Sequence, residues 1–204
     1  MTAALTPAQR RAVAAVCSEL DRLARYDDES IVHDAWIRQR YEGGFAASYA
    51  PARSAAVRTA WHEAGHAIAA LAVGARFSSA SIRACGTSSG RVYSVRGGER
   101  GFVIDAAGQV AERLRDWTLP SSEQDVAAWL ASWRGDGGDA RRFRAGIRGA
   151  FGGNEATAWR YSVELLTPLR PRIRQLARGL LVYPRHLPYE VAVAIAGSGA
   201  SPCP

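Results

Sequence analysis

The sequence contains no lysine, so all 26 of its basic lysine or arginine residues are arginines. Phosphate-binding loops of the GxxxxGK[ST] type depend on a lysine, and an ATPase of that class is therefore excluded in this chain. Only 19 acidic residues balance the arginines, which leaves a formal net charge of +7. Because the arginines are scattered along the chain, we interpret them as solvated helix faces and expect no nucleic-acid partner.

Cysteine and long apolar runs are also scarce. Cys17, Cys85 and Cys203 are widely spaced and form no CxxC pair, which argues against a disulfide framework and against a cysteine-based zinc site. No apolar run approaches the roughly 18–20 residues that cross a bilayer, so no membrane association is expected. The N-terminus lacks a basic start followed by an apolar stretch, and we therefore expect no signal peptide and a cytoplasmic location.

Periodicity and capping signals predict a mainly α chain. Thr6 and Gln9 have the spacing of a capping box, with a proline at the first helical position. The interior of residues 53–73 is nearly all alanine, isoleucine, leucine and valine, which indicates a central, buried helix. The expected helices cover residues 6–25, 29–41, 53–73, 102–117, 123–133, 139–151, 154–183 with a break near Pro168 and Pro171, and 189–196.

Two short strand-like runs interrupt this helical pattern, at residues 75–86 and 90–98. Their arginines and serines favour an exposed sheet edge over a fully buried strand. The predicted fold class is therefore mainly α (α+β): a long central helix, a small β-sheet with an edge strand, and a helical bundle after it. We expect a helical N-terminal segment of unknown role (1–50), a main domain (51–197) and a disordered tail (198–204).

The stretch RTAWHEAGHAIAALAVG (58–74) carries the most specific chemical signal. His62 and His66 are one helical turn apart, so both imidazoles can bind a single Zn²⁺ ion. Glu63 projects from the same turn, where it can act as the general base; this is the HExxH pattern of zinc peptidases. A buried helix must satisfy such polar groups, and Gly65 in its middle suggests that something approaches the backbone closely there.

A catalytic zinc site usually needs a third protein ligand. The spacing leaves several carboxylates open, and by analogy with zincins that use a glutamate from a following helix, Glu112 is the first choice. The candidates are Asp105, Glu112, Asp116, Glu123 and Asp125.

Residues 56–196 resemble the proteolytic domain of the FtsH family of ATP-driven zinc proteases. The resemblance rests on AWHEAGHAIAALAVG, FSSASIRACGTSSGRVYS, AAGQVAERL, SSEQDVAAWLASW and the closing stretch from WRYSVELL to LPYEVAVAI, in that order. It implies a zinc-dependent endopeptidase with one Zn²⁺ per chain, bound by His62, His66 and Asp125, with Glu63 as base. Glu112 then becomes a packing residue or a partner behind a ligand.

The resemblance also implies that an extended substrate pairs with an edge strand through main-chain hydrogen bonds. The residues expected at that edge are Arg91, Val92, Tyr93, Ser94 and Val95. We expect this chain to carry neither the family's ATPase module nor its membrane anchor. We therefore expect cleavage of unfolded or specifically recruited proteins, with a homo-oligomer or a separate ATPase as possible partners.

Two other functions remain open at this stage. One is a regulatory metalloprotease of the ImmA/IrrE type that cuts a specific repressor, recruited through residues 1–50. The other is a non-enzymatic, arginine-rich helical protein that binds nucleic acid. His33 and His186 are interpreted as surface or packing histidines. His33 lies in the segment 1–50, which could block the zinc as a pro-region would if it folds over the site.

Overall fold

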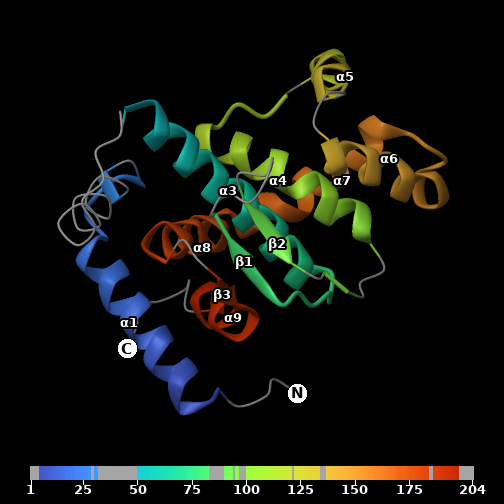
Figure 1. Cartoon of the computed structure of the whole chain (residues 1–204). Helices are drawn as coiled ribbons and strands as arrows, with labels where there is room; N and C mark the ends of the chain where they lie inside the picture. Colours follow the sequence, from blue (N-terminus) through green and yellow to red (C-terminus); the bar gives the residue numbers. More distant parts are fainter. Residues whose placement is uncertain are drawn as a thin grey trace.

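A computed structural model of the chain describes residues 5–28, 30–31, 50–82, 90–93, 95–96, 100–120, 122–133, 137–183 and 186–197. It is mostly helical with one small antiparallel sheet, which confirms the predicted mainly α (α+β) class (Figure 1). The helices are α1 (Pro7–Arg22), α3 (Ala50–Ala72), α4 (Gly101–Asp116), α5 (Glu123–Ser132), α6 (Gly137–Phe151), α7 (Glu155–Leu166), η2 (Thr167–Leu169), α8 (Arg170–Val182) and α9 (Tyr189–Gly197). The strands are β1 (Ser79–Ser81), β2 (Arg91–Tyr93) and β3 (Leu187–Pro188).

Local signals account for most of these boundaries. The capping box at the start of α1 is formed, with the Gln9 amide N–H donating to Thr6 Oγ1 at 3.2 Å and the Thr6 N–H donating to Gln9 Oε1 at 2.8 Å. The break expected near Pro168 is the short η2 turn between α7 and α8. The predicted helix over 29–41, together with His33, Ser94 and the tail 198–204, lies almost wholly outside the described residues.

The sheet has the order β2-β1-β3, so β1 is central. β1 pairs antiparallel with β2, with Ala80 opposite Val92, and on its other side with β3. Within the described part of the chain β2 therefore lies at a sheet edge, as predicted for residues 91–95. β3 was not predicted, because a strand of two residues has no periodicity to detect.

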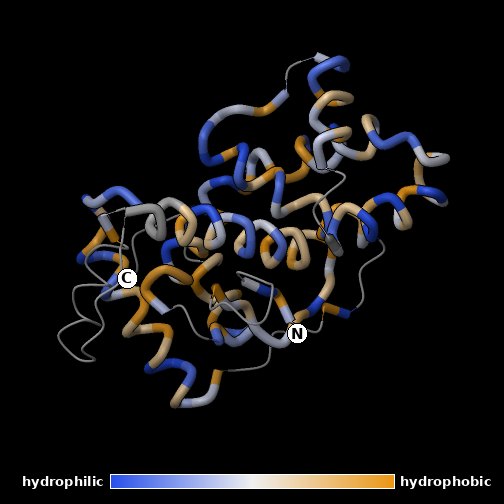
Figure 2. The backbone as a smooth tube through the Cα atoms, turned by 45° about the horizontal axis from the view of Figure 1, so that its top comes forward, coloured by the Kyte–Doolittle hydropathy of each residue, from blue (hydrophilic) through white to orange (hydrophobic). Residues whose placement is uncertain are grey.

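Helix α3 runs through the centre of the molecule, between α4 and α8 (Figure 1). Trp61 and the alanines on both sides of it are almost fully buried. Figure 2 shows hydrophobic and hydrophilic residues alternating along the outer helices, as expected for helices that bury one face. In the described residues, no helix combines the length and the apolar character that a bilayer crossing requires.

The close approach that Gly65 suggested is the contact between α3 and α4. A Cβ atom at Gly65 would lie 2.4 Å from the Ala107 carbonyl oxygen and 2.6 Å from the Ala111 Cβ. Both distances are too short for non-bonded atoms, so only glycine permits this spacing of the two helices. The spacing matters because α3 and α4 together form the floor of the site described below.

We expect Gly65→Ala to lower the free energy of unfolding by about 3 kcal/mol, since the added methyl group collides with backbone that cannot turn aside. Gly149→Ala is the matched control: this exposed glycine in α6 has open space around it, so alanine should stabilise its helix by up to about 1 kcal/mol. Urea denaturation of both variants measures the difference. Equal effects of the two substitutions would contradict the helix contact.

The described part of the N-terminal segment shares its core with the rest of the chain. Val16, Leu20 and Ile31 belong to the same hydrophobic cluster as α3, and α1 packs on α8 and α9. Asp28 accepts a hydrogen bond from Trp61 Nε1 at 2.9 Å and forms an ion pair with Arg178 at 2.8 Å. This segment is thus connected to the residue that directly precedes His62.

Candidate metal centre

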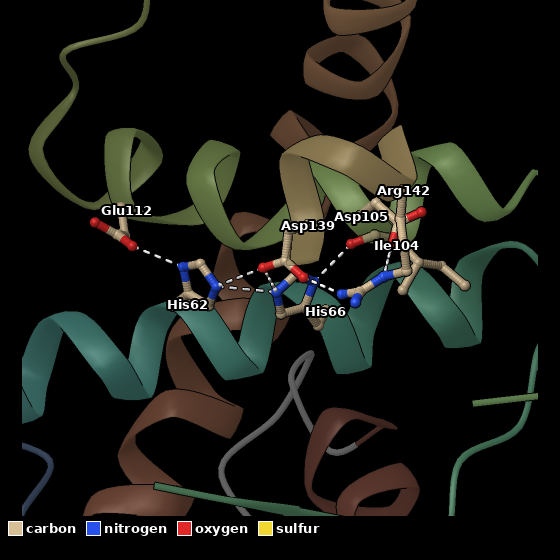
Figure 3. A network of polar contacts seen from close by, with 7 residues as sticks. All are labelled: His62, His66, Ile104, Asp105, Glu112, Asp139 and Arg142. Atoms are coloured by element: carbon tan, nitrogen blue, oxygen red, sulfur yellow. Dashed lines mark hydrogen bonds and ion pairs between the residues drawn. The ribbon is translucent and has the colours of Figure 1, made fainter. Parts of the chain in front are cut away.

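Three side chains from two helices meet above α3. His62 and His66 point their Nε2 atoms at each other, 3.0 Å apart, from successive turns of α3. Asp139, in the first turn of α6, places its Oδ2 atom 3.3 Å from His62 Nε2 and 3.2 Å from His66 Nε2 (Figure 3). Each of these residues offers one ligand atom to a common point, and together they could hold a metal ion.

The second nitrogen of each imidazole is already engaged. His66 Nδ1 lies 2.6 Å from the Ile104 carbonyl oxygen, which can only accept, so this nitrogen carries the hydrogen. His62 Nδ1 lies 2.7 Å from Glu112 Oε1, a carboxylate that also accepts. When the rings are neutral, both Nε2 atoms therefore present lone pairs toward the Asp139 carboxylate. The two Nε2 lone pairs and the Asp139 carboxylate oxygen repel one another unless a cation or protons lie between them. Histidines that bind a metal through Nε2 typically carry their hydrogen on Nδ1 and donate it to an acceptor, as both rings do here.

A glycine on α4 makes room for one of the rings. A Cβ atom at Gly108 would lie 2.5 Å from both Cε1 and Nε2 of His62. The His62 ring therefore rests against bare backbone, and this fixes its direction. The position falls inside the AAGQVAERL stretch that carried part of the sequence resemblance.

The electrostatics of the centre favour a cation. Burial lowers the pKa of His62, but the hydrogen bonds to Asp139 and Glu112 outweigh it and raise that pKa to about 10. Burial would raise the pKa of Asp139, yet hydrogen bonds to both histidines hold it well below its usual range. Burial raises the pKa of Glu63, although the neighbouring His66 and His62 oppose that shift. Three carboxylates thus surround two imidazoles, which is an environment that attracts positive charge.

Glu63 shares helix α3 with the two histidines and lies against the backbone that enters β2. It is buried, with 6% of its surface exposed. A Cβ atom at Gly90 would lie 2.8 Å from Glu63 Cγ and 2.9 Å from Glu63 Oε1, so the backbone entering β2 passes directly against this side chain. The predicted base and the predicted edge strand are therefore neighbours.

Arg142 holds the third carboxylate in place. Its Nε atom donates to Asp105 Oδ1 at 2.8 Å, and its guanidinium also bonds Asp139 Oδ1 (Figure 3). Asp139 is thus anchored by one oxygen, while the other faces the two histidines. Such partners behind a ligand fix its orientation and its charge.

We expect Arg142→Met to weaken metal binding by about 10-fold, because the Asp139 carboxylate loses the bond that directs it. Arg141→Met is the matched control, since Arg141 is an exposed neighbour with no ion pair among the described residues. Competition with a chromophoric chelator measures both affinities. If the two variants bind the metal equally well, Arg142 does not position the ligand.

Asp125, the third ligand implied by the resemblance, lies elsewhere. It is exposed in the first turn of α5, and its Oδ2 atom accepts from the Ser122 hydroxyl at 2.6 Å in a capping box. The structure brings Asp139 to the histidines in its place. Of the other carboxylates considered, Glu112 bonds His62, as expected for a residue behind a ligand. The remaining three form ion pairs with arginines: Asp105 with Arg142, Asp116 with Arg115, and Glu123 with Arg160.

A signal for Asp139 was present in the sequence. It follows Gly137 and Gly138 and opens a predicted helix, which is the kind of position expected of Asp125. Both aspartates begin helices that follow α4, and spacing does not distinguish them. Only the packing of α6 on α4 shows which one reaches α3.

Among the residues expected at the edge, Arg91, Val92 and Tyr93 form β2, and Val95 is exposed just beyond it. His186 is exposed beside the same sheet, with its ring 5.1 Å from that of Tyr93. No protein-family model and no curated protein matches this chain. The residues of the centre and of the sheet edge are therefore the features that indicate a function.

Proposed function

We propose that this chain is a zinc-dependent endopeptidase that resembles the FtsH proteolytic domain. The observation that supports it best is the convergence of His62 Nε2, His66 Nε2 and Asp139 Oδ2 next to a buried glutamate. Two histidines and one carboxylate are a donor set that catalytic zinc sites use. In this proposal Asp139, and not Asp125, is the third ligand.

The distances fit such an ion. Zinc binds nitrogen and carboxylate oxygen at about 2.0–2.2 Å in tetrahedral geometry, which separates its ligand atoms by about 3.3 Å. The three separations here are 3.0, 3.2 and 3.3 Å. Larger, oxygen-preferring ions such as Ca²⁺ take six to eight oxygen ligands, which this nitrogen-rich set does not offer.

A zinc ion in such a centre lowers the pKa of a bound water molecule and polarises a carbonyl group. Glu63 accepts the proton from the attacking water and passes it to the leaving amine. Its burial favours this exchange, because a raised pKa brings the carboxylate closer to neutral pH. Glu112 and the Ile104 carbonyl hold the two imidazoles in the tautomer that leaves Nε2 free.

Substrate binding is assigned to the β2 edge. In the described part of the sheet, one side of β2 pairs with β1 and the other side pairs with no strand. An extended peptide that adds there would run past Glu63, because the Gly90 backbone touches that side chain. Flexible or unfolded segments fit this mode, since folded proteins rarely present a free extended strand.

We place the activity in the cytoplasm.

The test is to purify the full chain, load it with Zn²⁺ and measure metal content and cleavage of an unfolded protein such as casein. We expect one zinc ion per chain. We also expect a chelator to stop cleavage and added Zn²⁺ to restore it. A chain that takes up no metal, or that binds zinc and cleaves nothing, would contradict the proposal. Cleavage of a single partner protein and not of casein would favour the regulatory type of metalloprotease.

A further inference from the structure

We propose that the β2 edge selects acidic peptides, with Arg91 as the residue that receives an aspartate or glutamate side chain close to the scissile bond. This inference rests on the proposed peptidase function. It goes beyond that function because neither the metal centre nor the free strand edge specifies a sequence preference.

The first observation is an uneven distribution of charge. Between Glu63 and Glu99 the sequence contains no acidic residue in 35 positions, although the whole chain has 19 acidic residues. Four arginines fall in the same stretch: Arg76, Arg83, Arg91 and Arg96. The part of the chain that forms β1 and β2 therefore carries only positive charge, directly beside the proposed catalytic glutamate.

The second observation is the position of Arg91. It opens β2, directly after Gly90, which touches Glu63, and its side chain is exposed. Its guanidinium lies 5.8 Å from the centre of the Tyr93 ring. Among the residues that the structure describes, no carboxylate forms an ion pair with Arg91, whereas Arg144 and Arg178 have carboxylate partners within 3 Å. Arg91 thus offers an exposed guanidinium at the point where the edge meets the base. Its charge acts on the nearby Glu63 carboxylate and opposes the rise in pKa that burial causes there, but the two do not form an ion pair.

The third observation concerns the other end of the edge. Arg76 and Arg96 are paired directly across the sheet, with reciprocal backbone hydrogen bonds of 2.9 and 2.7 Å, and both are exposed. Like charges in directly opposite positions destabilise a sheet, and a bound anionic group would relieve that repulsion. Arg96 is five residues from Arg91, which corresponds to about 16 Å of extended chain. This odd spacing in one register puts the Arg91 and Arg96 side chains on opposite faces of the sheet, so both faces of the edge carry positive charge where a peptide would pair.

These features fit an acidic peptide better than a nucleic acid. A peptide that adds to β2 satisfies the free backbone groups of the edge, and its alternate side chains point to one face of the sheet. A guanidinium can hold a carboxylate through two parallel hydrogen bonds, and it repels lysine and arginine side chains. Acidic residues near the cleaved bond are thus favoured, and basic ones are disfavoured.

The experiment uses the full-length, zinc-loaded Glu63→Gln chain and three fluorescent peptides of one scaffold, which carry glutamate, glutamine or lysine near the expected cleavage point. Fluorescence anisotropy measures the dissociation constants. We expect the glutamate peptide to bind about 10-fold more tightly than the glutamine peptide, and the difference to shrink between 50 and 500 mM salt. Adding Arg91→Glu should reverse the order of the glutamate and lysine peptides.

Arg172→Glu on the same background is the matched control, because it makes the same charge change at an exposed site on α8 and should keep the original preference. Equal binding of the glutamate and glutamine peptides, no binding of any peptide, or a preference that survives Arg91→Glu would overturn the inference. Tighter binding of a single-stranded oligonucleotide than of the acidic peptide would overturn it too.

Cleavage by the zinc-loaded wild-type chain separates this inference from the proposed function. If all three peptides are cleaved with the same kcat/KM, the peptidase function stands and the charge preference is refuted. If none is cleaved while the binding order is as expected, the preference stands and the peptidase function is refuted.

Discussion

Glu63→Gln is expected to lower kcat for peptide hydrolysis by at least about 100-fold while zinc content stays at one per chain. The amide cannot take a proton from water, so the variant loses the general base. It has the same size as the carboxylate, and Glu63 is not one of the three residues that offer a ligand atom, so the His62–His66–Asp139 arrangement should persist. Steady-state cleavage of an unfolded protein, together with metal analysis by mass spectrometry, measures both properties.

Glu164→Gln provides the comparison for this variant. Glu164 is an exposed residue of α7, and the same change of one carboxylate to an amide there should leave kcat unaltered. A Glu63→Gln chain that cleaves as fast as the Glu164→Gln chain would show that Glu63 is not the base. If the Glu63 variant lost its metal, the glutamate would instead be a structural part of the centre.

Asp139→Ala is expected to reduce zinc affinity by at least about 100-fold, since one of three protein ligands is removed. Asp125→Ala should leave zinc binding intact. It should instead lower the free energy of unfolding by about 1 kcal/mol, because the capping box with Ser122 at the start of α5 is lost. Chelator competition measures the zinc affinity of both variants, and urea denaturation measures the free energy of unfolding of both.

The opposite result has an equally clear meaning. If Asp125→Ala abolished zinc binding and Asp139→Ala did not, the third ligand would be the one that the sequence resemblance implied, and α5 would have to approach α3. If both variants kept their metal, neither aspartate would be a ligand. Histidines alone would then hold the ion.

Much of the fold could be predicted because its signals are local. The capping box at Thr6, the prolines around residue 168 and the apolar interior of α3 are all short-range patterns. The first two mark observed helix ends, and the third lies within an observed helix. β3 escaped prediction because two residues carry no periodicity, and their pairing with β1 depends on a contact about 110 positions apart in the chain.

Only the two histidines of the candidate metal centre could be predicted from the sequence, because the third residue depends on a contact between distant helices. His62 and His66 share one helix, so their spacing alone brings them together. The third carboxylate comes from a different helix, and the choice between Asp125 and Asp139 depends on how α6 packs on α4. Glu112 was recognised as a residue of the site, but its bond to His62 Nδ1 became visible only when α4 was placed beside α3.

The hydrogen bond from Trp61 to Asp28 has a consequence for how the chain loses its structure. The described part of the N-terminal segment is held to the rest of the chain, because Asp28 bonds both the residue before His62 and Arg178 of α8. Proteolytic trimming up to residue 31 would leave the indole N–H and the guanidinium without their carboxylate, and would open the core at Ile31. We therefore expect melting of this segment and release of the metal to occur in one cooperative transition.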